Sequence, residues 1–568
     1  MNSRRMASRT WTLGLGGSDH DFSAVLMHGA DIKVAIEQER LSRVKHGHSV
    51  WYRNPVREAV DYCLASEGVG LADVEWIAAS DTLATRARAD LGGKPLKLFR
   101  HHLCHAASAY LALPRSGRTG IIVYDGYGSI RSPASASGPR ARETFSFFLF
   151  SDQGYEELGT TCGLSEIEED DFPAAVTNSV GLLYELVTSL LGWDLLDTGK
   201  TMGLASYGSP RHLGELEEHI VYGDTMSDCF ACPTGASALT ATIEGILDAG
   251  RGSFASRADL ASSVQAIVNR ALLNCARLMR PYELDHFAIS GGCALNTVAN
   301  AHLVARSGLG VPVTVSPHSG DAGLGLGALW LAQQEAEGTV PNLTFQGGPT
   351  YPALCRPGRL YSLAERRAAA LQFYPRLVAD PAHSTPDSLA AALADGMILG
   401  VLQGRSEIGP RALGGRSILA DPRQVQTRER INRLMKRREP FRPLAPMVLE
   451  SDYVHYFADA RQSDPFMLKV SNVLDRCARE APAVVHVDGT ARVQVVSETD
   501  APFLAALLKA FKARTGVGVL INTSFNRRGE PIVETPTDAI DAFLGLGLDG
   551  LYLDGDFYWP AEPERLST

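Results

Sequence analysis

Two similar glycine-rich hairpin patterns constrain the fold of this chain more than any other feature of its sequence. The first is formed by short apolar runs at Thr12–Gly17 and Phe22–Met27, with a third strand predicted at Ile32–Glu37. The pattern recurs where the run Gly120–Tyr124 meets the letters D-G-Y-G and is followed by an aromatic strand at Thr144–Phe150. A recurring unit of this kind predicts a duplicated α/β domain.

The order of elements after the second hairpin supports the same duplication. A helix is predicted over Leu260–Met279, a strand over His286–Ser290, and a second strand over Val311–Ser316 that leads into a helix of small residues at Ala322–Gln334. Glycines at such strand-to-helix junctions let the backbone approach phosphate groups closely. The sequence therefore favours a duplicated actin-like nucleotide-binding fold, the ASKHA fold shared by actin, sugar kinases and heat-shock chaperones.

The length of the chain, 568 residues with 45% hydrophobic residues, predicts two or three domains, because a single core rarely grows that large. We expect an ASKHA-type domain at 1–345, a linker rich in proline and glycine at 346–358, and a second α/β domain at 359–568. The elements predicted for the second domain are the strands Met397–Gln403 and Val517–Asn522 and the helices Gln424–Arg438, Ala501–Thr515 and Thr537–Leu544.

The charge and composition exclude several classes of function. A formal net charge of -10 argues against nucleic acid as a partner, because binding to a phosphate backbone needs a broad basic face. No apolar run is long enough for a signal-peptide core or a membrane span, so we expect a cytoplasmic protein with no membrane partner. Nine scattered cysteines fit reduced thiols, and Cys229 and Cys232 lack the second C-x-x-C pair that a zinc ribbon needs.

A metal site is predicted from two histidines on one helix and two aspartates on loops. His101 and His105 lie four residues apart in a helix-favouring stretch, so their side chains share one face. Asp125 and Asp321 each follow a strand at a glycine-rich loop, where they could supply the anionic oxygens that a hard or borderline divalent ion needs. His102 points elsewhere on the helix and is interpreted as a supporting or structural residue. A structural histidine pair in the core is the alternative.

Two segments of the first domain have residues suited to phosphate. Lys200 lies in the run D-T-G-K-T-M-G-L-A, which places a lysine and backbone amides together as a phosphate cradle requires. The same run could instead be a tight turn before a helix. Gly291 and Gly292 join a strand to a helix that is predicted to begin near Cys293, and this junction is a second candidate for phosphate contact.

The densest set of basic residues lies in the predicted second domain. Arg411 and Arg442 each stand beside a proline in a loop, which favours rigid, bidentate binding of phosphate or carboxylate. Most basic residues of the helix Gln424–Arg438 are interpreted as solvated surface, because they cannot all face one way. Arg492 and the polar run that contains Ser524 could form the wall of a pocket, although the run could also be an ordinary turn.

Taken together, the motifs of this chain resemble the carbamoyltransferase family, which includes enzymes that carbamoylate nodulation factors and tobramycin, cephamycin and ansamycin antibiotics. The resemblance extends from His20 to Asp554. The motifs are H-H-L-C-H-A-A-S-A-Y, K-T-M-G-L-A-S-Y-G, S-G-G-C-A-L-N, G-P-R-A-L-G-G-R-S-I-L-A-D-P, F-R-P-L-A-P and I-N-T-S-F-N-R-R-G-E-P-I-V.

The resemblance implies a first domain related to the tRNA threonylcarbamoyl-transfer ATPases and a YrdC-like second domain. It implies that carbamoyl phosphate and ATP, with Mg(II), form carbamoyl-adenylate in the second domain. The carbamoyl group then passes to the hydroxyl of a small-molecule acceptor in the first domain, where the implied metal is iron(II). The site residues implied by the matching motifs are His101, His105, Asp125 and Asp321 for the metal; Lys200, Gly291, Gly292 and Asn296 for the nucleotide; Arg411, Lys436, Arg442, Arg492 and Ser524 for adenylation; and His20 and Lys45 for transfer.

Three residues depart from the family pattern: Ser129 after the D-G-Y-G loop, Thr198 before G-K, and Ser406 between an arginine and a glutamate. One alternative interpretation is a carbamoyl-transfer enzyme acting on a protein cysteine, but such hydrogenase-maturation factors carry acylphosphatase and zinc-finger modules that do not match this sequence. Another is a nucleotide-binding regulator or scaffold without chemistry. The sequence leaves open the identity of the acceptor and whether the chain forms a homodimer.

Overall fold

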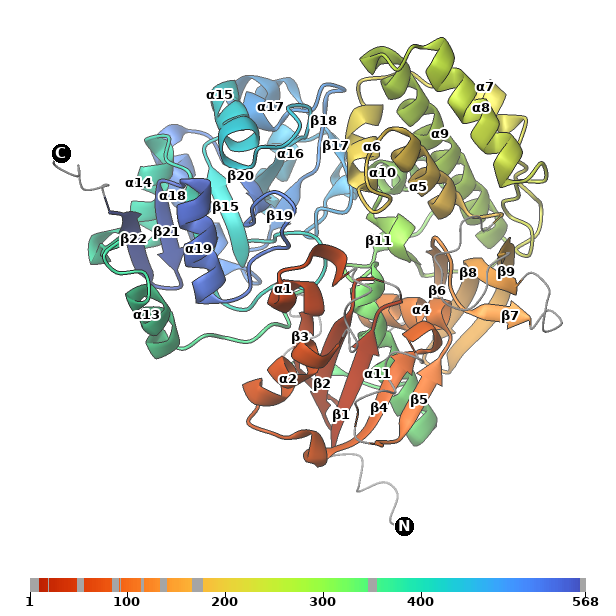
Figure 1. The fold of residues 1–568 in the computed structure, drawn as a ribbon, viewed down its shortest axis with the longest axis horizontal. Helices are drawn as coiled ribbons and strands as arrows, with labels where there is room; N and C mark the ends of the chain where they lie inside the picture. The colour runs from red at the N-terminus through yellow and green to blue at the C-terminus, as the bar shows by residue number, and fades with distance from the viewer. Residues whose placement is uncertain are drawn as a thin grey trace. The chain divides into compact units, whose positions relative to one another are not determined.

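A computed structural model describes residues 10–18, 20–47, 56–83, 91, 93–113, 117–132, 140–165, 177–345 and 355–561. The chain divides into two units (Figure 1). The first contains Met1–Gln38 and Gly47–Leu354, and the second contains Glu39–His46 and Cys355–Thr568. Residues 346–354 of the predicted linker lie outside the described residues. The grouping of Glu39–His46 with the second unit was not predicted from the sequence.

Two mixed sheets form the framework of the first unit. One has the order β12-β3-β2-β1-β4-β5, with strands Thr344–Phe345, Asp31–Glu37, Ser23–His28, Trp11–Gly16, Val74–Ser80 and Leu96–Phe99. The other has the order β11-β10-β6-β8-β7, with β9 (Gly154–Ser165) paired to β8, and its other strands are Val313–Val315, His286–Ser290, Thr119–Tyr124, Arg140–Ser151 and Ile130–Ser132.

The two sheets share one topology. In the first sheet β2 pairs antiparallel with both β1 and β3, whereas β4 pairs parallel with both β1 and β5. In the second sheet β8 pairs antiparallel with β6 and β9, whereas β10 pairs parallel with β6 and β11. The prediction of a duplicated actin-like α/β domain is therefore confirmed, because each sheet repeats the same sequence of antiparallel and parallel neighbours.

Close helix packing positions the residues at the strand ends of the first unit. Helix α4 (His101–Leu111) is buried along its whole length and packs against α11 (Leu324–Glu337). A Cβ atom at Gly327 would lie only 1.9 Å from the carbonyl oxygen of Cys104, so this glycine allows the two helices to cross at short range. The remaining helices of this unit are α2 (Arg57–Ser66), α5 (Val180–Leu190), α6 (Thr198–Ala205), α7 (Leu213–Glu217), α8 (Ala236–Ala249), α9 (Phe254–Met279) and α10 (Thr297–Arg306).

The second unit is built on a mixed sheet with the order β13-β22-β21-β14-β15-β20-β16-β19. Its strands, in that order, are Leu377–Ala379, Asp556–Pro560, Gly550–Leu553, Leu399–Leu402, Arg416–Ala420, Val519–Ser524, Ala445–Leu449 and Gln494–Val496. The short strands β17 (Ser471–Asn472) and β18 (Thr490–Ala491) pair separately. The helices are α13 (Leu363–Leu371), α14 (Pro386–Ala394), α15 (Val425–Glu429), α16 (Tyr453–Tyr456), α17 (Asp475–Glu480), α18 (Pro502–Thr515) and α19 (Pro536–Leu546).

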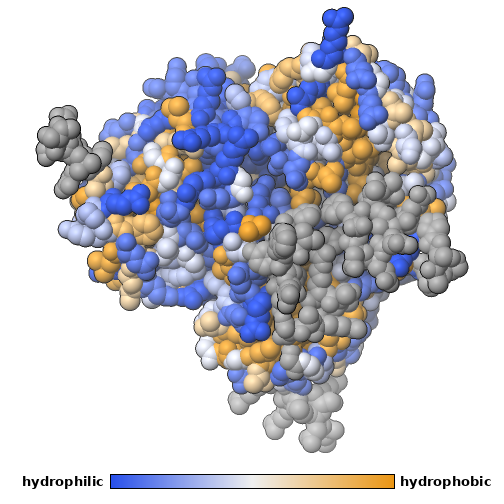
Figure 2. Space-filling view, in the orientation of Figure 1, coloured by the Kyte–Doolittle hydropathy of each residue, from blue (hydrophilic) through white to orange (hydrophobic). Residues whose placement is uncertain are grey.

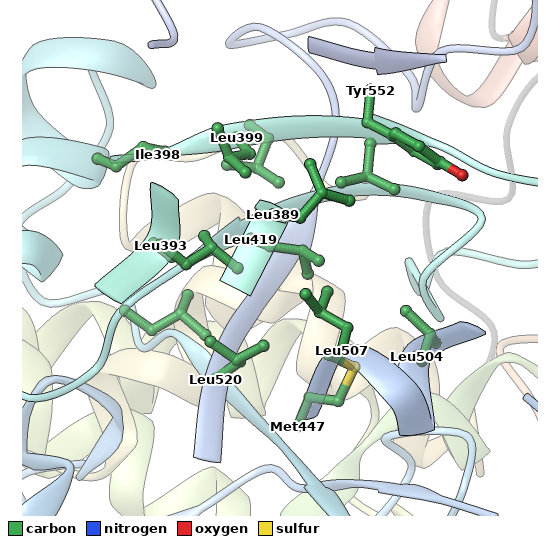
Figure 3. Packing of buried hydrophobic residues seen from close by; sticks show 14 of the residues in the cluster. Leu389, Leu393, Ile398, Leu399, Leu419, Met447, Leu504, Leu507, Leu520 and Tyr552 are labelled. Atoms are coloured by element: carbon green, nitrogen blue, oxygen red, sulfur yellow. The ribbon is translucent and has the colours of Figure 1, made fainter. Parts of the chain in front are cut away.

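The core of the second unit joins helices α14 and α18 to the sheet. Figure 3 shows Leu389 and Leu393 of α14 and Leu507 of α18 beside Leu419 of β15. These four leucines are fully buried. Truncation of such a residue to alanine typically costs about 2 to 5 kcal/mol of stability. The predicted strands and helices of this unit bury their apolar faces here, which fixes the loops at the strand ends.

One predicted element of the second unit differs from the structure. The helix expected at Gln424–Arg438 is α-helical only over Val425–Glu429 and continues as a π-helical turn over Arg430–Met435. The amide of Lys436 donates to the carbonyl of Ile431, five residues earlier, at 2.8 Å. This wider turn rotates the residues that follow it relative to a regular helix.

Figure 2 shows hydrophilic and hydrophobic residues interspersed over the described residues of the face in view. Among the described residues, no helix is both long and apolar enough to cross a membrane. All nine cysteines are free thiols. Cys229 is buried and Cys232 is partly exposed, and both lie in the connection between α7 and α8.

Candidate functional site

Four buried side chains of the first unit converge on one point. His101 and His105 come from α4, Asp125 follows β6, and Asp321 begins a 3-10 turn, Asp321–Gly323, before α11. The Nε2 atom of His105 lies 3.1 Å from Asp125 Oδ2 and 3.4 Å from Asp321 Oδ1. The Nε2 atoms of the two histidines are 3.2 Å apart. The structure thus brings together all four residues that the sequence predicts as metal ligands, with one ligand atom of each within 4.8 Å of the others.

Neighbouring hydroxyl groups orient this cluster. Thr82 Oγ1 lies 3.0 Å and Ser80 Oγ lies 3.4 Å from Nδ1 of His101, on the side of the ring opposite the carboxylates. The hydroxyl of Ser18 donates a hydrogen bond to Asp321 Oδ2. Contacts of this kind fix the ring orientation of a ligating histidine and the direction of a carboxylate.

The electrostatics of the cluster favour positive charge at its centre. Burial lowers the pKa of His105, but hydrogen bonds to Asp125 and Asp321 and the charges of these residues outweigh burial and raise it to about 9. Burial raises the pKa of each aspartate, whereas the two histidines lower it, and the lowering prevails. Two imidazole nitrogens and two carboxylate oxygens match the donors of a borderline divalent ion. The residues therefore fit a borderline divalent metal, a class that includes iron(II).

Ser129, one of the residues that depart from the family pattern, supports the start of α4. The N-cap residue of this helix, Arg100, makes no side-chain cap hydrogen bond. Instead, the amide of His101 donates to Ser129 Oγ at 2.7 Å, and this hydroxyl donates to Asp81 Oδ1 at 2.6 Å. A serine hydroxyl from the loop after β6 therefore caps the helix that carries both histidines.

A buried ion-pair group lies next to this cap and was missed by sequence reasoning. Glu143 on β8 is fully buried and pairs with Nη1 of Arg100 at 3.0 Å. Its Oε2 atom also accepts hydrogen bonds from the amides of His102 and Ser129, each at 3.3 Å. The imidazole of His102 points away from the four-residue cluster and lies 2.8 Å from Ser146 Oγ through Nδ1. These contacts span up to 44 residues of sequence, so no local pattern marks them.

His20 follows the hairpin strand β1 and has a carboxylate partner. Its Nδ1 atom lies 3.2 Å from Asp21 Oδ2. Burial lowers the pKa of His20, but the hydrogen bond to Asp21 and the charges of Asp21, Asp321 and Glu185 raise it to about 10. Glu185 on α5, which sequence reasoning missed, has a pKa raised to about 7, because burial outweighs the opposing charge of His20. His20 and Glu185 therefore act electrostatically on each other and on the metal-site carboxylates.

Lys45, the other residue implied in transfer, begins the 3-10 turn Lys45–Gly47. It belongs to the segment Glu39–His46, which groups with the second unit, whereas His20 groups with the first. The structure does not place the two residues in one unit. The role of Lys45 in transfer stays a prediction.

The residues implied in nucleotide contact gather at the ends of α6 and α10. Lys200 on α6 pairs with Asp197 at 2.7 Å. Gly291 has a φ of +93°, and a Cβ atom there would lie 2.3 Å from the carbonyl oxygen of Tyr124, so the close approach of β10 to β6 requires glycine. Asn296 caps α10 by accepting a hydrogen bond from the amide of Ala299 at 3.0 Å.

The same region shows where the remaining glycine and the expected helix lie. Gly292 starts a 3-10 turn, Gly292–Leu295, and the helix predicted near Cys293 begins at Thr297 instead. A Cβ atom at Gly292 would lie 3.0 Å from Asp125 Oδ1, so this turn abuts the metal-site loop. The Thr297 hydroxyl contacts the sulfur of Met202 on α6 at 3.6 Å, which places the lysine-bearing helix beside this turn.

The second unit concentrates cations in partly buried positions. Burial and the charge of Arg442 lower the pKa of Arg411 to about 10, against the opposing effect of Asp464. Burial and the charges of Arg411, Arg438 and Arg442 lower the pKa of Arg492 well below its ordinary value. Among the described residues, the buried Nε atom of Arg492 has no hydrogen-bond partner. The structure therefore brings the three predicted arginines into mutual repulsion.

Arg438 is a further member of this cation cluster and was not predicted. Burial and the charge of Arg442 lower its pKa to about 9, although Glu439 opposes them. Its Nε atom donates to Asn432 Oδ1 at 2.8 Å, whereas its buried Nη2 has no hydrogen-bond partner among the described residues. The sequence places Arg438 at the end of a basic helix, where it resembles solvated surface. Because the chain forms a π-helical turn at Arg430–Met435, Arg438 lies in the cation cluster instead.

Lys436 and Ser524 meet in the same cluster. The Nζ atom of Lys436 lies 2.5 Å from the Ser524 carbonyl oxygen, 3.0 Å from Ser524 Oγ and 2.9 Å from Asn526 Oδ1. Burial lowers the pKa of Lys436 well below its ordinary value, and the charges of Arg438 and Arg442 add to this effect. Neutral oxygens surround the ammonium group, so an anion is the partner that would relieve the repulsion among these cations.

Comparison with known families accounts for both halves of the chain. A family model described as the carbamoyltransferase N-terminus matches residues 77–330, and one described as the carbamoyltransferase C-terminus matches residues 390–558. The chain belongs to the carbamoyltransferase family. This identification confirms the resemblance seen in the sequence motifs and assigns the chain an activity in carbamoyl transfer.

This carbamoyltransferase is similar in sequence to several named proteins. Nodulation protein NolNO of Sinorhizobium fredii is 32% identical over 555 residues, which cover 94% of this chain and 78% of the relative. The 3'-hydroxymethylcephem-O-carbamoyltransferase of Amycolatopsis lactamdurans is 37% identical over 279 residues, which cover 48% of this chain and 49% of the relative. A solved structure of full-length HypF in its phosphate- and nucleotide-bound form aligns at 15% identity with a TM-score of 0.35, covering 59% of this chain and 57% of that chain.

Proposed function

We propose that this carbamoyltransferase is an ATP-dependent O-carbamoyltransferase. In this proposal the second unit makes carbamoyl-adenylate from carbamoyl phosphate and ATP, and the first unit transfers the carbamoyl group to a hydroxyl of a small natural product. The single observation that best supports it is the cluster of Arg411, Lys436, Arg438, Arg442 and Arg492, in which burial and mutual repulsion lower the pKa values of Arg411, Lys436, Arg438 and Arg492. Such a cluster is costly unless an anion binds, and the proposed substrates are anions.

The cation cluster suits the adenylation step. Water first cleaves carbamoyl phosphate into carbamate and inorganic phosphate. A carbamate oxygen then attacks the α-phosphorus of ATP, the new P–O bond forms, and the bond to the leaving pyrophosphate breaks. Negative charge moves onto the oxygen that joined the α- and β-phosphates, which becomes a terminal oxygen of pyrophosphate. Fixed cations that face this position stabilise the transition state without reorganising, and one such contact is typically worth about 3 to 4 kcal/mol. Arg442 and Arg411, each held beside a proline, supply rigid contacts of this type.

The geometry around His20 suits the transfer step. The acceptor oxygen attacks the carbamoyl carbon, a C–O bond forms, and the bond to the phosphate oxygen of AMP breaks. The hydroxyl proton must leave, and Nε2 of His20 is the atom proposed to take it, because Nδ1 is oriented by Asp21. When bound, a divalent cation at Asp125 and Asp321 supplies positive charge for the adenylate phosphate and offsets carboxylate charge that raises the pKa of His20. Iron(II) is the ion implied by the family.

The acceptor class is drawn from the relatives. The name of the relative from Amycolatopsis lactamdurans describes O-carbamoyl transfer to a 3'-hydroxymethylcephem. By analogy, a hydroxyl of a small natural product is proposed for this chain. The pocket that selects one alcohol depends on side chains from several loops, so analogy extends to the class of acceptor only.

The release of pyrophosphate from ATP tests the proposal. Wild-type protein should release pyrophosphate only when carbamoyl phosphate is present, and mass spectrometry should detect a carbamoylated alcohol when a suitable acceptor is added. The rival hypothesis, a nucleotide-binding regulator or scaffold, predicts ATP binding without pyrophosphate release under any of these conditions. Arg442→Ala is the matched variant, because it should abolish the release while the protein remains folded.

A further inference from the structure

The segment Glu39–His46, here called the strap, is encoded in the first half of the chain but packs within the second unit. Helix α1 (Gln38–Ser42) begins it, and the amide of His46 donates to Glu39 Oε2 at 2.6 Å, which closes the strap on itself. The residues that flank the strap, Gln38 and Gly47, group with the first unit. The strap is therefore an eight-residue segment of the first half of the chain whose tertiary contacts are made with the second unit.

The first anchor of the strap is Arg40, a fully buried arginine. Its Nη2 atom donates to the carbonyl oxygen of Gly409 at 2.7 Å. Gly409 has a φ of +93° and lies two residues before Arg411, a member of the cation cluster. The strap thus holds the backbone of the loop that presents one of the proposed anion-binding residues.

That loop is built around a buried carboxylate. Glu407 Oε1 accepts hydrogen bonds from the amides of Leu413 at 2.7 Å and Gly415 at 2.7 Å. Burial raises the pKa of Glu407, but the charges of Arg356, Arg40 and Arg416 outweigh burial, so the pKa is lowered. Arg40 therefore serves the loop twice, as a donor to its backbone and as a countercharge to the carboxylate at its centre.

The second anchor of the strap is Arg43, which binds the backbone of a different segment of the second unit. Its Nη1 and Nη2 atoms donate to the carbonyl oxygens of Ile532 and Pro531, each at 2.8 Å. The amide of the next residue, Val533, donates to the carbonyl of Phe525 at 3.0 Å. Residues 531–533 therefore back the turn that begins at Ser524, which contacts Lys436.

We propose that Arg40 and Arg43 are positioning residues of the adenylation site. Arg40 acts through the loop that carries Arg411, and Arg43 acts through residues 531–533, which support the turn that begins at Ser524. This inference rests on the proposed function, because it assigns the strap a part in that reaction. Arginine suits this positioning role because a guanidinium stays charged and offers several donors in a fixed plane, which a pair of backbone carbonyls can accept. The site of the second unit is then incomplete without residues encoded in the first half of the chain.

The test is a double-mutant cycle in the full-length protein. Arg40→Met should lower kcat for carbamoyl-phosphate-dependent pyrophosphate release by about tenfold or more, with a smaller change in KM for ATP, because loss of one charge-assisted hydrogen bond typically has an effect of this size. Arg40→Lys, which keeps one donor and the charge, should restore much of the loss. In an Arg411→Met background, Arg40→Met should have little further effect, because it acts through Arg411. Arg43→Met should likewise lose its effect in a Ser524→Ala background.

The control is Arg514→Met, which removes an exposed ion pair with Asp387 in the same unit and should leave the rate unchanged. Circular dichroism well below the melting temperature checks that each variant is folded. Fully additive effects of Arg40→Met and Arg411→Met, or a normal rate in Arg40→Met, would overturn the proposal.

A failure of the proposed function gives a different result from a failure of this inference. If the wild type releases no pyrophosphate, the adenylation reaction is wrong, and the same cycle is then measured through the Kd of inorganic pyrophosphate. Non-additive weakening of pyrophosphate binding by Arg40→Met and Arg411→Met supports the positioning role without the reaction. Additive weakening, or no pyrophosphate binding by the wild type, overturns it.

Discussion

Replacement of Arg411 by methionine should stabilise the ligand-free protein while weakening its binding of anions. Methionine preserves much of the volume of the arginine stem and removes its charge. In the absence of an anion, burial of Arg411 and the charge of Arg442 lower its pKa to about 10, although the charge of Asp464 opposes them. Removing one cation from this repulsive cluster relieves a cost that the folded state otherwise bears.

The magnitude follows from that pKa. The lowered value corresponds to roughly 3 kcal/mol of unfavourable charge interaction at neutral pH, since each tenfold change in a proton equilibrium is worth about 1.4 kcal/mol. Arg411 is partly exposed, so solvent screening reduces the expected gain to about 1 to 2 kcal/mol. For a domain of this size, each kcal/mol shifts the melting temperature by about 2 to 4 °C. The sign is unusual, because most substitutions at partly buried positions destabilise.

The assay is thermal unfolding with and without inorganic pyrophosphate. At a concentration about one hundred times its Kd, pyrophosphate should stabilise the wild type by about 2.7 kcal/mol. A tenfold or greater rise in Kd, the expected effect of removing one charge-assisted contact, reduces that gain to about 1.4 kcal/mol or less. Arg367→Met is the control, because the guanidinium of Arg367 is exposed in its ion pair with Asp556 and its loss should leave the melting temperature nearly unchanged.

Two results would refute this reasoning. If Arg411→Met melts at a lower temperature than the wild type without ligand, the cations are not in net repulsion. If the variant keeps the full pyrophosphate-induced shift, Arg411 does not face the bound anion. Either result would remove the main support for an anion site in the second unit.

Three further predictions concern other residues. His105→Ala should lower the content of divalent metal measured by elemental analysis, whereas His102→Ala should retain it, because His102 contacts Ser146 and lies outside the cluster of four ligands; full occupancy in His105→Ala would contradict the site. His20→Gln should keep carbamoyl-phosphate-dependent pyrophosphate release but lose carbamoylated product, and in the wild type the transfer rate should rise with pH as His20 deprotonates, because neighbouring carboxylates raise its pKa. Loss of both activities in folded His20→Gln would exclude a role confined to transfer. Burial and the charges of Arg492 and Arg428, opposed by Asp488, lower the pKa of His486 to about 4. The unfolded state therefore binds more protons between pH 4 and 6.5, and the urea midpoint should fall by an amount equivalent to about 1 to 2 kcal/mol as the pH drops through this window. If the urea midpoint of His486→Gln depends on pH as strongly as that of the wild type, this histidine is not responsible.

The elements of the first unit were predictable because their signals are local. The alternation and turn residues at Thr12–Gly17 and Phe22–Met27 mark a hairpin, and the structure has β1 and β2 at Trp11–Gly16 and Ser23–His28. The helical spacing of His101 and His105 places both side chains on one face of α4, as observed. The meeting of these histidines with Asp125 and Asp321 follows from strand ends that share one edge of a sheet.

The parts that sequence reasoning missed depend on contacts between distant residues. Glu143 pairs with Arg100 across 43 positions, and no periodicity reports such a pair. The π-helical turn at Arg430–Met435 is equally hidden, because its residues have ordinary helix propensity and only tertiary packing widens the turn. Because a regular helix was predicted at Gln424–Arg438, Arg438 was interpreted as a surface residue. The strap shows no signal at all, since its contacts lie 369 positions from Arg40 and 489 from Arg43.

The strap also determines how this chain can be recombined with its relatives. A hybrid joined near residue 354 would separate Arg40 from Gly409 and Arg43 from Pro531 and Ile532, although both halves would look complete in the sequence. A hybrid that keeps residues 39–46 together with the second unit, so that they come from the same parent, preserves these contacts. Exchange of the first unit between relatives therefore requires two crossovers inside the first half of the gene in addition to the one at the linker.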